Sequence, residues 1–128
     1  PAVPGVLPNL PEARDNIKRY TTVSDLSEAV RAMKEIKQLH RSKEWVLLPD
    51  RYDNLRELLI SIKTNNQYLS GDEVRSIQGM IASIADIERR LDEARQKEAA
   101  PYQVHEVNHW INKKSETLYQ TLVTLTRG

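Results

Sequence analysis

Residues 105–109 read HEVNH, the segment of the chain whose residue types and spacing most directly suggest chemistry. Two histidines four residues apart share one face of a helix and can bind zinc, with the intervening glutamate as a general base. A catalytic zinc site also requires a third protein ligand and an open coordination position. The segment after His109 contains one acid, Glu116, and no further histidine. The motif therefore matches a zinc peptidase, but the context that such an enzyme requires is missing.

The predicted helix around HEVNH carries its apolar residues on the other side. At about 100° per residue, the apolar side centres near Val107, Ile111 and Leu118, whereas His105 and His109 point into solvent. Three interpretations stay open: a zinc peptidase, weak zinc binding by these two histidines, and a solvated helix face, which the sequence favours. We therefore expect no catalytic residues, no cofactor and no bound metal beyond a weak zinc site, and we expect that the protein is not an enzyme.

The composition restricts the other classes of function. A length of 128 residues suits one domain. The formal net charge is +1, so no overall field favours nucleic acid or an acidic membrane. The chain has no cysteine, which excludes disulfides and thiolate chemistry. No apolar run approaches the roughly 18 residues that span a membrane, so we predict a protein that is not inserted in one.

The first 22 residues differ from the rest of the chain. Prolines at positions 1, 4, 8 and 11 interrupt helices and favour extended geometry. The sequence therefore predicts an extended N-terminal arm over residues 1–22. This arm is either an unstructured tail or a segment that becomes ordered when it docks on a partner. Its candidate docking residues are Pro4, Val6, Leu7, Pro8 and Leu10.

Apolar residues after position 22 recur at three- and four-residue spacing, which predicts amphipathic helices. Ser24 is the predicted N-cap of the first helix, and Pro49 suits the first turn of the second. Ser70 and Glu73 form a capping box for the third. The predicted helices span about residues 25–44, 49–66, 71–98 and 102–126. Because short connections favour antiparallel neighbours, the predicted fold class is all-α, an up-down antiparallel four-helix bundle over residues 23–128.

Basic residues recur every three or four positions along the first predicted helix, so they share one face. This basic stripe consists of Arg31, Lys34, Lys37, Arg41 and Lys43. It is either a solvated face, a surface that docks on an acidic protein, or a nucleic-acid contact. We expect no nucleic acid, because aromatic residues for stacking are not interleaved with the charges. His40 lies near the apolar side of the same helix and is predicted to be partly buried and hydrogen-bonded.

Several landmarks occur in order along the chain. After the proline-rich start, Trp45 follows the first helix in the segment SKEW at 42–45. IERRLDEA at 87–94 is followed by Lys97, and Thr117, Leu118 and Leu122 lie in the last helix. Together they resemble the PsbQ family, whose third helix ends in Ile-Glu-x-Leu-Asp-x-Ala, here with one extra residue. The paired tyrosines of plant members are absent where His109-Trp110 stands, which suggests an algal or divergent member.

The resemblance implies a non-catalytic extrinsic subunit of photosystem II that stabilises the oxygen-evolving centre and its retention of calcium and chloride. It implies a location in the thylakoid lumen of the chloroplast, peripheral to the membrane. The expected partners are photosystem II membrane subunits and other extrinsic subunits, which the chain would bind as a monomer. Two alternatives stay open: a PsbQ-like subunit of the chloroplast NADH-dehydrogenase-like complex, and a bacterial four-helix sensory or interaction module.

Overall fold

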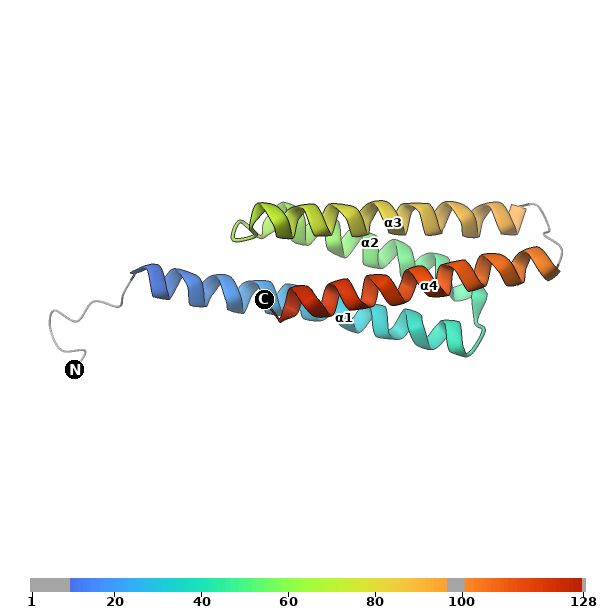
Figure 1. Ribbon diagram of the computed structural model, residues 1–128, viewed down its shortest axis with the longest axis horizontal. Helices are drawn as coiled ribbons and strands as arrows, with labels where there is room; N and C mark the ends of the chain where they lie inside the picture. Colours follow the sequence, from blue (N-terminus) through green and yellow to red (C-terminus); the bar gives the residue numbers. More distant parts are fainter. Residues whose placement is uncertain (1–9, 97–100, 128) are drawn as a thin grey trace, which may run out of the picture.

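The computed structural model describes residues 10–96 and 101–127, and every long element in these ranges is a helix. The elements are α1 (Leu10–Arg41), the 3-10 turn η1 (Trp45–Leu47), α2 (Leu48–Asn65), α3 (Gly71–Gln96) and α4 (Pro101–Thr126). Figure 1 shows that consecutive helices run in opposite directions. The described part of the chain contains no strand. The prediction of an all-α protein is confirmed, and the arrangement is compatible with the predicted four-helix bundle.

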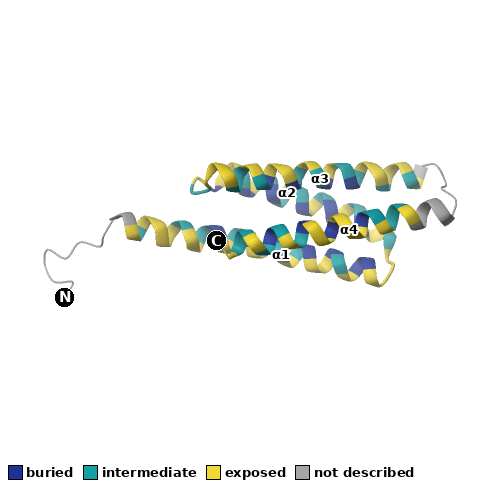
Figure 2. Ribbon diagram, viewed as in Figure 1, coloured by how far each residue is buried: buried dark blue, intermediate teal, exposed yellow. Residues whose placement is uncertain are grey.

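Each helix packs against two others. α1 contacts α2 and α4, and α3 contacts the same two helices, so α1 and α3 lie on a diagonal. The buried residues lie on the sides of the helices that face the rest of the bundle (Figure 2). On α3 they are Ile77, Met80, Ile84 and Ile87, and on α4 they are Ile111, Leu118 and Leu122. These residues belong to the apolar sides that the sequence predicted. None of the described helices is long and apolar enough to cross a membrane.

Local signals place the starts of α2 and α3. Pro49 lies in the first turn of α2, where its missing N–H is not needed. At the start of α3, the Glu73 N–H donates to the Ser70 hydroxyl at 3.2 Å, and the Ser70 N–H donates to the Glu73 carboxylate at 2.9 Å. This is the predicted capping box. The observed bounds of α2, α3 and α4 lie within about two residues of the predicted ones, the usual uncertainty of helix ends.

The start of α1 differs from the prediction. The helix begins at Leu10, so the expectation of an extended arm is wrong for residues 10–22, and Ser24 lies inside the helix. Pro11 does not interrupt α1 because it occupies the first turn, and residues 12–41 contain no proline or glycine. Residues 1–9 lie outside the described ranges. The docking positions predicted there, Pro4, Val6, Leu7 and Pro8, therefore have no structural description.

The end of α1 is capped by a lysine. The Glu44 N–H donates to the Leu39 carbonyl at 3.0 Å, and the Lys43 N–H donates to the His40 carbonyl at 3.3 Å. This pair of bonds is a Schellman motif. Lys43 has a φ of 57°, the left-handed conformation that glycine usually supplies at this position. The chain therefore turns from α1 toward η1 at a residue whose Cβ strains the backbone.

Replacing Lys43 with glycine is expected to raise the free energy of unfolding by about 1 kcal/mol, because glycine removes the left-handed Cβ clash. Urea unfolding followed by circular dichroism measures the change. The control is Lys43→Ala, which removes the same charge but retains the Cβ and should give no comparable gain. Equal unfolding free energies for the two variants would show that backbone strain at this position is negligible.

Candidate docking surface

The residues of the basic stripe do not all face solvent in the structure. Arg31, Lys34, Arg41 and Lys43 are exposed, the first three on α1 and the last in its cap. Lys37 instead points to α4 and is only partly exposed. Its ammonium lies 2.8 Å from the Glu116 carboxylate and 4.2 Å from the centre of the Tyr119 ring. The expectation that all five cations face outward is therefore corrected for Lys37.

Lys37 deviates because it lies at the edge of the buried row of α1. The next helix supplies an acid and an aromatic ring at that edge, and both attract an ammonium. The pKa of the Glu116 carboxyl lies below its ordinary value. The largest cause is the hydrogen bond from Lys37, and the next is the hydrogen bond from Gln120. Lys37 thus connects α1 to α4, and a partner protein would find its charge already paired.

Arg31 and Lys34 differ from the cations that link one helix to another. Arg56 lies 2.8 Å from Glu88 across α2 and α3, and Arg51 lies 3.2 Å from Glu35 across α2 and α1. The side chains of Arg31 and Lys34 have no ion pair or hydrogen bond within the part of the chain that the structure describes. These two charges are therefore available to a partner of opposite charge.

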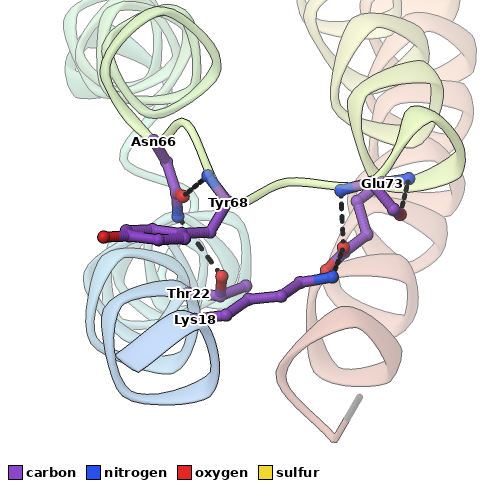
Figure 3. A network of polar contacts seen from close by, with 6 residues as sticks. Lys18, Thr22, Asn66, Tyr68 and Glu73 are labelled. Atoms are coloured by element: carbon purple, nitrogen blue, oxygen red, sulfur yellow. Dashed lines mark hydrogen bonds and ion pairs between the residues drawn. The ribbon is translucent and has the colours of Figure 1, made fainter. Parts of the chain in front are cut away.

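The connection between α2 and α3 fixes α1 where it enters the bundle (Figure 3). The Asn66 side-chain amide donates to the Thr22 hydroxyl at 3.3 Å. The same nitrogen donates to the Asp25 carboxylate at 3.2 Å. The Asn66 side-chain oxygen accepts the Tyr68 N–H at 2.9 Å. Thr22 and Asn66 are buried. Without these hydrogen bonds, their polar side-chain groups would lose their bonds to water uncompensated, which would destabilise the fold.

A second contact lies one turn earlier on α1. The Lys18 ammonium is 3.2 Å from the Glu73 carboxylate, which also accepts the N–H of Ser70 (Figure 3). Partial burial of Glu73 acts to raise its pKa, but the hydrogen bonds from Ser70 and the charge of Lys18 outweigh it and lower the pKa. The capping box of α3 therefore also holds α1. This role could not be predicted from the sequence, because a capping box identifies only its own helix.

The three histidines occupy different environments. His40 is buried, and its Nε2 lies 2.8 Å from the Tyr52 hydroxyl, which confirms the prediction for this residue. Burial lowers the pKa of His40 to about 4. His109 is exposed on α4, as the helical wheel predicted, whereas the side chain of His105 lies outside the described part. Among the described residues, no three His, Cys, Asp or Glu side chains gather into a possible metal site.

A shallow groove between α3 and α4 is the other surface feature that bears on binding. It is lined by Ser76, Glu116, Thr117, Gln120, Thr121, Thr124 and Leu125. The hydroxyls of Thr117, Thr121 and Thr124 each donate to a carbonyl of their own helix. The threonines therefore present acceptors rather than free donors to the groove.

Comparisons with protein-family models, with curated proteins and with solved structures returned no match to this chain. The residues that carry the PsbQ resemblance can be located in the fold. Trp45 begins η1 and packs against the core, and its ring lies edge-on to that of His40. Ile87, Leu118 and Leu122 are buried. These four landmarks are thus packing residues, while the exposed cations Arg31 and Lys34 form the candidate contact surface.

Proposed function

We propose that this protein is a non-catalytic extrinsic subunit on the lumenal side of photosystem II. There it stabilises the oxygen-evolving centre and helps to retain calcium and chloride. The assignment to photosystem II comes from the PsbQ resemblance. The observation that supports docking is the exposure of Arg31 and Lys34 on α1 without a partner among the described residues, beside the internally paired Lys37. Exposed charges of one sign favour and orient an encounter with a surface of opposite charge.

In this proposal the protein lies in the thylakoid lumen of a chloroplast, on the membrane surface. It binds as a monomer to membrane subunits and to other extrinsic subunits. Arg31, Lys34 and Arg41 contact an acidic surface, and the N-terminal residues Pro4, Val6, Leu7 and Pro8 supply further contacts. Since exposed charges are screened over about 8 Å at physiological salt, the complex should dissociate as the salt concentration rises.

Neutralising the exposed basic residues is expected to weaken docking without unfolding the protein. The variant Arg31→Gln/Lys34→Gln/Arg41→Gln should bind salt-washed photosystem II membranes about tenfold more weakly, if each exposed contact contributes roughly 0.5 kcal/mol. Co-sedimentation at low salt measures binding. Oxygen evolution at low calcium and chloride measures its consequence.

The matched control removes three cations from the helix diagonal to α1. Arg75, Arg89 and Arg95 lie on α3 and pair with acids three residues away. Their replacement by Gln gives the same change in net charge and should leave binding near the wild-type value. Equal loss in both triple variants would mean that net charge, rather than this surface, governs docking. If the wild type does not bind the membranes, the photosystem II proposal is wrong.

The NADH-dehydrogenase-like complex is the other candidate partner that the resemblance allows. Co-purification from thylakoids separates the two, because each complex migrates as a distinct assembly. Recovery with photosystem II subunits supports the proposal. Recovery only with the NADH-dehydrogenase-like complex supports the alternative.

A further inference from the structure

The first turns of α1 expose a row of apolar side chains. Ile17, Tyr20 and Val23 are 51%, 78% and 38% exposed. Their spacing of three residues places them along one side of the helix. At about 100° per residue this side lies roughly opposite Thr22 and Leu26, which are buried against the bundle. The row therefore cannot be covered by α2, α3 or α4.

This part of α1 also projects from the bundle. Thr22 lies beside Asn66, which follows the last residue of α2. The N-terminal turns of α1 extend beyond the other three helices, as Figure 1 shows. The Lys18–Glu73 pair and the Asn66 hydrogen bonds hold the base of this projection. The exposed row is thus presented on a helix whose orientation is fixed before any partner binds.

The unpaired cations continue the same side of α1. On the helical wheel Arg31 and Lys34 fall within about 40° of Tyr20. Lys34 lies about 20 Å along the helix from Tyr20. We call Ile17, Tyr20, Val23, Arg31 and Lys34 the outer face of α1. Its apolar end and its basic end are both exposed. Tyr and Arg are the residue types that most often dominate protein–protein contacts.

We propose that the outer face of α1 is the docking surface for a protein on which an apolar recess lies beside an acidic patch. Tyr20 and Ile17 fill the recess, and Arg31 and Lys34 meet the acids about 20 Å away. The prior fixing of α1 reduces the entropy lost on binding. That the recess and the acidic patch belong to a photosystem II subunit rests on the proposed function.

The features of the outer face favour a protein over a lipid surface. A helix that lies in a membrane interface needs a long apolar side and a basic polar side. Here the apolar row has only three large residues. Two acids, Glu28 and Glu35, border the same face, and Glu35 is held by Arg51. A continuous anionic lipid surface would face these carboxylates as well as the cations, whereas a protein can place its acids opposite Arg31 and Lys34 alone.

The test compares a pair of exposed apolar residues in the first turns of α1 with another pair in η1, beyond the end of α1. One variant is Ile17→Gln/Tyr20→Gln, which retains good helix formers. The matched control is Val46→Gln/Leu47→Gln in η1, where the native side chains are 89% and 43% exposed. With salt-washed photosystem II membranes as the probe, the first variant should bind roughly 30-fold more weakly. The control should stay within about twofold of the wild type. Thermal unfolding by circular dichroism verifies that both variants fold.

A photo-crosslinker at the centre of the row gives a second readout in an otherwise native chain. With Tyr20→p-benzoylphenylalanine, irradiation of the bound protein should give a covalent product with a protein subunit. A product with lipid only, or equal wild-type binding to protein-free phosphatidylglycerol vesicles, would overturn the protein partner. Wild-type binding that the Ile17→Gln/Tyr20→Gln variant retains would overturn the docking surface and leave the proposed function standing. Absence of wild-type binding would overturn both.

Discussion

Acidification is expected to lower the free energy of unfolding by about 3 kcal/mol through the single side chain of His40. The imidazole has a pKa of about 4 in the folded protein, against 6.5 when unfolded. Above pH 6.5 it is neutral in both states, and its contribution to stability is complete. As the pH falls from 6.5 to 4, only the unfolded state takes up the proton, so stability decreases. Below pH 4 both states are protonated and the loss ends.

The surroundings of His40 explain why the folded protein resists protonation. Nε2 lies 2.8 Å from the Tyr52 hydroxyl, and the ring meets Trp45 and Tyr52 edge-on. Burial raises the pKa of Tyr52, although a hydrogen bond with Ser115 partly opposes this, so the phenol stays neutral. The His40 Nδ1 is buried with no hydrogen-bond partner among the described residues. An imidazolium here would be removed from water, and no carboxylate of the described residues acts on the His40 pKa to offset that cost.

Urea unfolding at pH values between about 7 and 4 tests this expectation. The variant His40→Gln can still hydrogen-bond to Tyr52 but cannot titrate, so its stability should fall less than that of the wild type. His109→Gln is the matched control because His109 is exposed, and this variant should follow the wild-type curve. If wild type and His40→Gln lose the same free energy of unfolding over this range, another group causes the acid sensitivity.

Truncating the centre of α3 is expected to have an effect of similar or larger size. Ile84 is fully buried at the inward face of α3. Ile84→Ala should lower the free energy of unfolding by roughly 2–5 kcal/mol, because the lost methyl groups leave a cavity that the surrounding helices fill only in part. The change is measured as a shift of the urea midpoint at constant slope.

Ile81→Ala is the matched control on the same helix. Ile81 is only partly buried against the core, so the same truncation should cost less than about 1.5 kcal/mol. The difference between the two variants reports which side of α3 faces α2 and α4. Equal losses of unfolding free energy in the two variants would contradict the observed packing, in which the Ile84 side of α3 faces the core.

Much of the helical architecture could be predicted from the sequence because its signals are local. Apolar residues recur at three- and four-residue spacing along α3, and the structure buries Ile77, Ile84 and Ile87 on its inward side. Pro49 and the Ser70–Glu73 box lie at the starts of their helices, since capping bonds join residues only three positions apart. The exposure of His109 also followed from the wheel. For these features the periodicity of the helix was sufficient.

The tertiary structure decided how the first turns of α1 are held and which of its charges are free. Ser24 resembled an N-cap, but a cap acts only where the preceding residues leave the helix, and α1 continues back through the Lys18 and Thr22 contacts to Leu10. The sequence placed Lys37 in the basic stripe. In the structure its charge is paired with Glu116 of α4, a residue distant in sequence. Spacing along one helix specifies the side on which a residue lies. It does not specify which neighbouring helix packs there, because that depends on how the four helices assemble.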